Sequence, residues 1–74
     1  MPVTAKEVIA ALERGGWVQT RQSGSHIRMR NQARPANSVT VSAYQGKELP
    51  AGTLRAIVRA AGLSPAEFEE LLKR

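Results

Sequence analysis

Apolar side chains recur at helical spacing near the start of the chain, at Ala5, Val8, Ile9 and Leu12. They overlap Thr4-Ala5-Lys6-Glu7, the pattern of a capping box, in which a threonine hydroxyl accepts a free helix amide and a glutamate reaches back to the cap. Gly15-Gly16 ends the pattern, since glycine readily adopts the left-handed conformation that closes many helices. A helix is therefore predicted over about residues 4–14.

Apolar and polar residues then alternate with the period of β-strands in three short runs, at residues 17–21, 25–30 and 38–42. Ser23-Gly24 favours a tight turn between the first two runs, which predicts a hairpin. A turn centred there places Arg21 opposite His26, Gln19 opposite Arg28 and Val18 near Met29. Residues 31–37, which include Pro35, are predicted to form a loop before the third strand.

The alternation also assigns the two faces of the predicted sheet, because successive side chains of a strand point to opposite sides. The core face receives Val18, Thr20, Ile27, Met29, Val39 and Val41. The solvent face receives Gln19, Arg21, His26, Arg28, Arg30 and Thr40, so it is strongly positive. A shift of the turn by one residue inverts the first strand, whose assignment therefore depends on the position of the turn.

The last third of the chain contains two more helical patterns. Pro50 is suited to the first turn of a helix, and the buried stripe of that helix is expected at Leu54, Ile57, Val58 and Ala61. Gly62-Leu63 predicts a Schellman stop. Ser64-Pro65-Ala66-Glu67 is a second capping box, and the apolar face of the last helix is expected at Phe68, Leu71 and Leu72.

These elements predict a single α+β domain over residues 1–74, with a double-stranded-RNA-binding-domain-like α-β-β-β-α order and a short extra C-terminal helix. Helices are expected to cover one face of a three-stranded antiparallel sheet. The other face is then left open to solvent. That layout is compatible with RNA binding but proves no activity, because a fold does not determine a function.

Positive charge is concentrated in the middle of the chain. The formal net charge is +5, and from Arg14 to Arg59 eight Lys and Arg residues accompany a single acid, Glu48. Such a field attracts polyanions, and nucleic acid fits better than a membrane because no amphipathic helix carries the charge. The alternative is a basic surface that is only solvated.

Composition excludes several kinds of chemistry. The chain has no cysteine, so it forms no disulfide and offers no thiolate. It has one histidine and no aspartate, too few ligands for a zinc site or a carboxylate cluster, so any catalysis is expected to need neither metal nor cofactor. No apolar run approaches the ~18 residues of a membrane span, and nothing resembles a signal peptide. We expect a soluble, cytoplasmic protein.

Gly24-Ser25-His26 places the only imidazole of the chain at the start of a strand, directly after a turn. Arg21, Arg28 and Arg30 are predicted on the same face. RNA carries its own nucleophile, the 2′-hydroxyl, so a protein need only orient the strand, move protons and stabilise the charged phosphorane. One histidine and several arginines suffice for that chemistry. The alternative is a surface histidine without a chemical role.

Eight short motifs occur in order along nearly the whole chain: Gly16-Trp17, Arg21-Gln22, Gly24-Ser25-His26, Val39-Thr40-Val41, Gly46-Lys47-Glu48-Leu49, Gly52-Thr53-Leu54-Arg55, Ala61-Gly62-Leu63 and Glu67-Phe68. Their order and spacing resemble the HicA toxin family. The resemblance implies a metal-independent endoribonuclease that cleaves mRNA and inhibits translation. It also implies neutralisation by a HicB-type antitoxin, which we expect to cover the face that carries His26.

The family's catalytic histidine corresponds to His26, and RNA contacts are expected from Arg21, Ser25, Arg28, Arg30 and Lys47. Two features depart from the family pattern. Ser42-Ala43-Tyr44 stands where the family often has proline and histidine, and Ile27 stands where it often has a second polar or basic residue. A possible second imidazole is thereby lost, which leaves open the group that completes proton transfer. Tyr44 could act as a proton donor, but its phenol is a poor base near neutral pH, and a structural role is the alternative.

Two other functions are compatible with the basic face. One is a non-catalytic RNA-binding module, and the other is an interaction protein whose basic face binds an acidic partner. Trp17 either stacks on a base or packs in the core. Arg55 and Arg59, one helical turn apart, either touch phosphates or are solvated.

Overall fold

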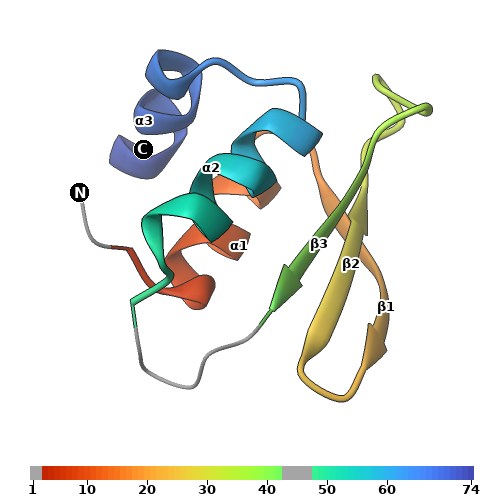
Figure 1. The fold of residues 1–74 in the computed structure, drawn as a ribbon. Coiled ribbons are helices and arrows are strands. Elements are labelled where there is room, and N and C mark those ends of the chain that lie inside the picture. Colours follow the sequence, from red (N-terminus) through yellow and green to blue (C-terminus); the bar gives the residue numbers. More distant parts are fainter. Residues whose placement is uncertain (1–2, 43–47) are drawn as a thin grey trace.

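Helices cover one face of a three-stranded sheet and leave the other face open (Figure 1). The computed structural model describes residues 3–42 and 48–74. Its elements follow the order α1 (Ala5–Arg14), β1 (Val18–Ser23), β2 (His26–Arg30), β3 (Ser38–Ser42), α2 (Ala51–Ala60) and α3 (Pro65–Lys73). The sheet is antiparallel, with the strands in the order β1-β2-β3. The predicted α+β architecture is confirmed.

Both predicted capping boxes are present. The amide of Glu7 donates to the Thr4 hydroxyl over 3.3 Å, and the Glu7 carboxylate accepts from the Thr4 amide over 3.0 Å. Ser64 and Glu67 repeat the arrangement at the start of α3, over 2.8 and 3.1 Å. The backbone and side-chain hydrogen bonds of Ser64 hold the pKa of the Glu67 carboxyl below its usual value, and nearby Arg34 acts in the same direction. Pro50 is the N-cap of α2 rather than part of its first turn.

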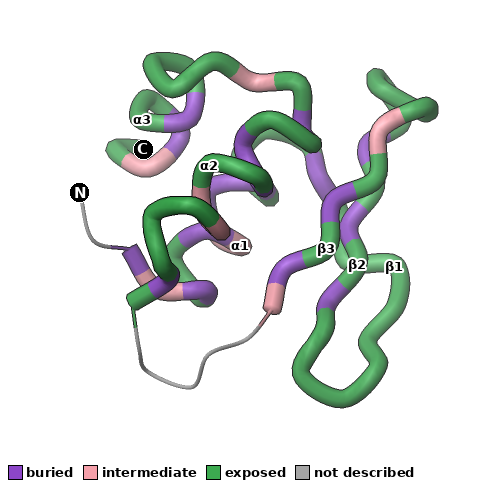
Figure 2. The backbone as a smooth tube through the Cα atoms, in the orientation of Figure 1, coloured by how far each residue is buried: buried purple, intermediate pink, exposed green. Residues whose placement is uncertain are grey.

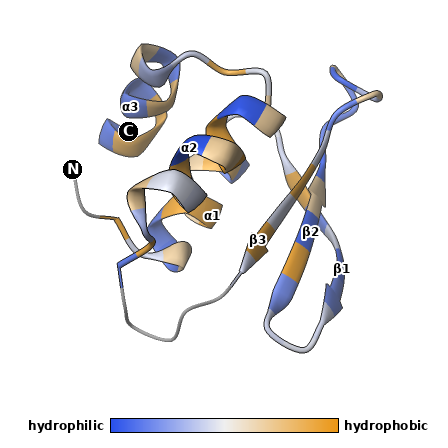
Figure 3. Ribbon diagram, viewed as in Figure 1, coloured by the Kyte–Doolittle hydropathy of each residue, from blue (hydrophilic) through white to orange (hydrophobic). Residues whose placement is uncertain are grey.

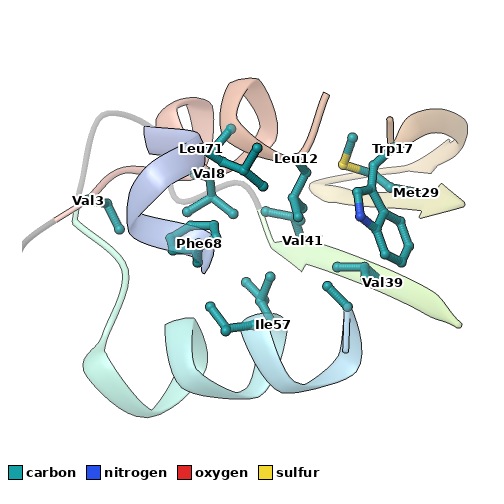
Figure 4. Packing of buried hydrophobic residues seen from close by; sticks show 14 of the residues in the cluster. Val3, Val8, Leu12, Trp17, Met29, Val39, Val41, Ile57, Phe68 and Leu71 are labelled. Carbon is teal, nitrogen blue, oxygen red and sulfur yellow. The ribbon is translucent and has the colours of Figure 1, made fainter. Parts of the chain in front are cut away.

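The core lies between the inner sheet face and the three helices of the described residues (Figures 2 and 4). The sheet contributes Ile27, Met29, Val39 and Val41, and the helices contribute Val8, Leu12, Ile57, Val58, Phe68 and Leu71. Trp17 joins this cluster and is only 2% exposed. Its role is therefore packing and not base stacking. The inward side chains of β2 and β3 are as predicted.

The hairpin differs from the prediction in register. A two-residue turn, Gly24-Ser25, joins β1 to β2, and Ser23 lies directly opposite His26. Gly24 has a φ of +59° while Ser25 has no positive φ, the pattern of a type II′ turn. Arg21 therefore lies opposite Arg28, two residues from the predicted partner. A shift of two residues preserves the face, so Arg21 still belongs to the solvent side.

A β-bulge between Gln19 and Arg21 changes the rest of β1. Beyond it, Val18 lies opposite Arg30 and Gln19 opposite Met29, which reverses their predicted faces. Val18 is 61% exposed, and Thr20, predicted in the core, is also exposed. The prediction was wrong here because a bulge adds one residue to one strand, and a single extra residue inverts the alternation.

The loop between β2 and β3 ties the sheet to the ends of two helices. Asn31, only 8% exposed, donates to the carbonyl oxygen of Gly15 at the end of α1 over 3.2 Å. Arg34 donates to the carbonyl oxygen of Gly62 over 3.1 Å, and Asn37 donates to that of Ala60 over 3.1 Å, at the end of α2. These side chains bond to carbonyl groups that a helix leaves without partners at its end. The loop thereby fixes the helical layer against the sheet.

Two glycines of this layer allow a matched stability test. Gly62 has a φ of +72°, and a Cβ there would lie 2.6 Å from Nη1 of Arg34, so Gly62→Ala should lower the free energy of unfolding by at least about 1–2 kcal/mol. Gly52, in the first turn of α2, has no atom within 4 Å of the position that a Cβ would take. Gly52→Ala should therefore raise the free energy of unfolding by about 0.5–1 kcal/mol. Urea unfolding followed by circular dichroism measures both. Equal stabilities of the two variants would contradict this account.

Candidate nucleic-acid interface

His26 is the first residue of the central strand β2 and follows the Gly24-Ser25 turn directly. The face to which the His26 side chain points follows from the burial of its neighbours on the same strand. Ile27 and Met29 are buried in the core, and the alternating positions 26, 28 and 30 are exposed. Because side chains on one strand alternate between faces, His26, Arg28 and Arg30 share the open side of the sheet. This is the arrangement expected from the sequence.

Two hydroxyl groups lie on either side of His26 on the open face. Ser23 of β1 and Ser42 of β3 are its direct partners in the sheet register. Directly opposite residues in an antiparallel sheet point to the same face, with Cβ atoms about 4.5–5.5 Å apart. We call this cross-strand row, Ser23–His26–Ser42, the histidine row. Sequence reasoning missed both serines, because their positions depend on the turn type and on the pairing of β2 with β3.

The next row along β2 contains two positive charges. Arg21 lies directly opposite Arg28, with Thr40 on the other side of Arg28. No Asp or Glu occurs in the sequence between positions 14 and 47, so this hairpin has no acid of its own to balance the pair. Like charges directly opposite each other on a sheet are unfavourable. We call this row, Arg21–Arg28–Thr40, the arginine row.

The third row combines Arg30 with Val18 and Ser38. The Arg30 guanidinium donates to the carbonyl oxygen of Pro35 over 3.3 Å, which uses one of its five N–H groups. The hydropathy colouring shows the polar character of β1 and of the alternate positions of β2 (Figure 3). The open face therefore has one row that contains the imidazole and two rows that contain guanidinium groups.

The other predicted positions lie apart from these rows or outside the described residues. Ser25 is exposed in the hairpin turn, beside the histidine row but not in it. Lys47 and Tyr44 fall within residues 43–47, which the structure does not describe. Arg55 and Arg59 lie on α2, on the covered side of the sheet.

Some of the central positive charge has a structural role. Arg14 donates to the carbonyl oxygen of Leu71 over 2.8 Å, which joins α1 to α3. Arg34 bonds to Gly62, as described above. In the described ranges, no three His, Cys, Asp or Glu residues are grouped so that they could hold a metal ion. None of the helices in these ranges is both long and apolar enough to cross a membrane.

Fold and site together define a small α+β domain with a covered sheet face and an open basic one, on which a single imidazole stands among arginines. Comparison with protein families identifies it further. Residues 5–63 match the family described as HicA toxin of bacterial toxin-antitoxin. This match extends over most of the chain, and the chain belongs to the HicA toxin family. The family resemblance noted in the motifs is confirmed.

A solved structure supports the same placement. A chain of a toxin-antitoxin complex from Streptococcus pneumoniae matches with a TM-score of 0.68 and 38% sequence identity, over 84% of this chain and 100% of that chain. Comparison with curated proteins finds no match.

The arginine row generates a test on the isolated protein. Arg21→Gln removes one of two facing charges, so it should raise the free energy of unfolding by about 0.2–1 kcal/mol at low salt. The gain should shrink in about 0.5 M salt, where exposed charges are screened. Arg21→Lys keeps the charge and serves as the control, with little change expected. Urea unfolding at both salt concentrations measures the effect, and a gain that is independent of salt would contradict the electrostatic origin.

Proposed function

We propose that this toxin is a metal-independent endoribonuclease that cleaves mRNA through His26 and thereby inhibits translation. The observation that carries the proposal is the position of the only imidazole of the chain, exposed on the central strand of the open face and next to a row of two arginines. Membership of the HicA toxin family supports the same activity. Because mRNA is the proposed substrate, we also propose that the protein acts in the cytoplasm.

The chemistry needs only groups that RNA and this face provide. His26 accepts the proton of a ribose 2′-hydroxyl, and the 2′-oxygen then attacks the adjacent phosphorus. The bond between phosphorus and the 5′-oxygen of the next nucleotide breaks as the new one forms. The leaving 5′-oxygen lies on the far side of the phosphorus and takes its proton from water, since the chain has no second imidazole. The products are a 2′,3′-cyclic phosphate and a 5′-hydroxyl.

The guanidinium groups stabilise the charge that develops during this step. A phosphorane carries more negative charge than the phosphodiester from which it forms, and charged donors fixed in position favour it over the ground state. Arg28 is two residues from His26 on the same face, and Arg21 is its direct neighbour across the hairpin. Arg30, Ser25 and Lys47 are proposed to make further contacts with the strand.

A non-catalytic RNA-binding module is the second candidate, because the same positive face would hold RNA without cleaving it. The two functions differ in what they require of His26. Binding alone needs the guanidinium groups, whereas cleavage also needs a group that exchanges protons near pH 7. An interaction protein that binds only acidic partners needs neither RNA affinity nor His26.

We further propose a HicB-type antitoxin as the protein partner, covering the histidine row and the arginine row. The similar chain from Streptococcus pneumoniae belongs to a toxin-antitoxin complex, which supports a protein partner of this class. An inhibitor of a nuclease with an open site must exclude the polyanion. Acidic groups of the antitoxin placed against Arg21 and Arg28 would achieve that and would speed association at low salt.

Replacement of His26 tests catalysis directly. His26→Ala should reduce the cleavage rate by about 10²- to 10⁴-fold, the usual loss for one general acid–base group. Its stability should change by no more than about 0.5 kcal/mol, since the side chain is exposed. Lys6→Ala, exposed on α1 on the covered side of the sheet, is the control and should keep its activity. Gel analysis of a defined RNA measures the rates.

The ends of the products test the mechanism in the same assay. A 2′,3′-cyclic phosphate and a 5′-hydroxyl are expected, and EDTA should not inhibit the parent protein. Full activity of His26→Ala would move catalysis to another residue. Ends with a 5′-phosphate would show that water attacks in place of the 2′-hydroxyl.

Hydrogen exchange of the complex with the antitoxin tests the proposed binding face. Amides in residues 21–30 should be protected when the antitoxin binds, because the inhibitor must cover the rows that hold RNA. Amides in α3 (Pro65–Lys73), on the covered side of the sheet, provide the internal control. Protection confined to α3, with residues 21–30 unchanged, would contradict the proposed interface.

A further inference from the structure

The three rows of the open face are evenly spaced along β2. They are centred on His26, Arg28 and Arg30, which are separated by two residues each. A strand rises about 3.3–3.4 Å per residue, so consecutive rows lie roughly 6.7 Å apart. This distance is close to the separation of consecutive phosphates in an extended RNA strand. The face therefore matches a polymer with one negative charge per repeat.

The rows differ in charge, and this difference distinguishes the two orientations in which a strand could lie along β2. The histidine row contains an imidazole and two hydroxyl groups. The arginine row has two guanidinium groups, and the third row has one, that of Arg30. On the other side of the histidine row, β2 is preceded by the Gly24-Ser25 turn, which has no charged side chain. Within β1 and β2, the cationic groups therefore follow His26 on one side only.

The arginine row is a favourable position for an anion. Arg21 and Arg28 face each other without an acid between positions 14 and 47, so their repulsion is not balanced within the hairpin. A phosphate between them would remove the repulsion and would accept from both guanidinium groups, which are well shaped for phosphate oxygens. The cross-strand distance of about 5 Å between their Cβ atoms brings both side chains within reach of one phosphate.

The width of the face indicates how many RNA strands it holds. Three strands about 4.8 Å apart form a surface roughly 10 Å wide between the axes of β1 and β3. Arg28 and Arg30 lie on the central strand, and Arg21 flanks it. The cationic groups thus follow one line and not two parallel ones, which fits one RNA backbone better than a duplex.

We propose that a single RNA strand runs along β2 in one fixed direction, with the scissile phosphate at the histidine row, the neighbouring phosphate between Arg21 and Arg28, and the phosphate after that at Arg30. This proposal rests on the proposed ribonuclease function and adds to it the register and the sidedness of the substrate. Arg28 and Arg21 then bind the phosphate next to the cut, and from that position their charge also favours the phosphorane at the histidine row.

Oligonucleotides with single neutral linkages test this register. The cut in an all-RNA oligonucleotide is mapped first. The same sequence is then made with 2′-O-methyl riboses except at the nucleotide that supplies the attacking 2′-hydroxyl, so that only one linkage can be cut. A methylphosphonate, which has no charge, replaces the first or the second linkage on either side of the cut, one linkage at a time. Single-turnover rates are measured for each oligonucleotide.

The neutral linkage should act on one side of the cut only. In the parent protein, neutralising the first linkage on that side should slow cleavage about tenfold, the usual effect of one charged hydrogen-bond partner. The same change on the other side should have little effect. In Arg28→Gln the unmodified oligonucleotide should be cut about tenfold more slowly, and the methylphosphonate at the first linkage should then slow cleavage by clearly less than in the parent protein, because only Arg21 still binds that phosphate. Arg30→Gln should show the same coupling to the second linkage.

Controls separate this proposal from the loss of fold or of function. Arg59→Gln removes the same charge from α2, on the covered side of the sheet. Its effect on the cleavage rate should multiply with the effect of every neutral linkage. Arg28→Lys keeps the charge and should restore part of the coupling, and circular dichroism checks that each variant is folded. One contrary outcome is that the parent oligonucleotide is cut while the effect of Arg28→Gln on the cleavage rate multiplies with the effect of every methylphosphonate linkage. In that case the proposed register is wrong and the ribonuclease function stands. If the parent oligonucleotide is not cut, the ribonuclease function fails, and the proposed register fails with it.

Discussion

The burial of Ile27 and Met29 is the constraint on which the rest of the molecule depends. Both residues lie on the central strand of a sheet whose described helices all lie on one side. If β2 rotated to expose them, the core would lose two large apolar side chains, each of which stabilises the fold by about 1.5–3 kcal/mol. Since strand side chains alternate, the same burial turns positions 26, 28 and 30 to solvent. The direction of the proposed catalytic group is thus a consequence of core packing.

The helical layer and the open face both follow from the small size of the chain. A chain of 74 residues has enough apolar side chains for one core, and only one face of the sheet contributes to that core. The loop after β2 compensates in part, because Asn31, Arg34 and Asn37 bond to carbonyl oxygens at the ends of helices. Hydrogen bonds thereby fix the layers of a domain whose core is small. The opposite face is left with no packing role and is available for charge.

Local signals predicted most of the fold. The capping boxes at Thr4 and Ser64, the stop at Gly62 and the alternation of β2 and β3 all depend on residues close in sequence, and all were confirmed. The register of β1 was wrong, because a turn type and a bulge decide it and neither has a clear signature in Ser23-Gly24. Ser23 beside His26 was missed for the same reason, and Ser42 was missed because its position depends on the pairing of β2 with β3. The family was identified correctly from motifs, whereas composition and charge alone left three classes of function open.

The bulge in β1 also bears on how copies of this protein avoid one another. β1 is an edge strand, and all of its residues are exposed, including Val18. A regular edge of this kind offers unpaired amide and carbonyl groups to any other strand, which is how many proteins begin to aggregate. The extra residue interrupts that row of groups, and Arg21 places a charge beside it. The irregularity therefore makes this edge a poor template for the strand of a second copy.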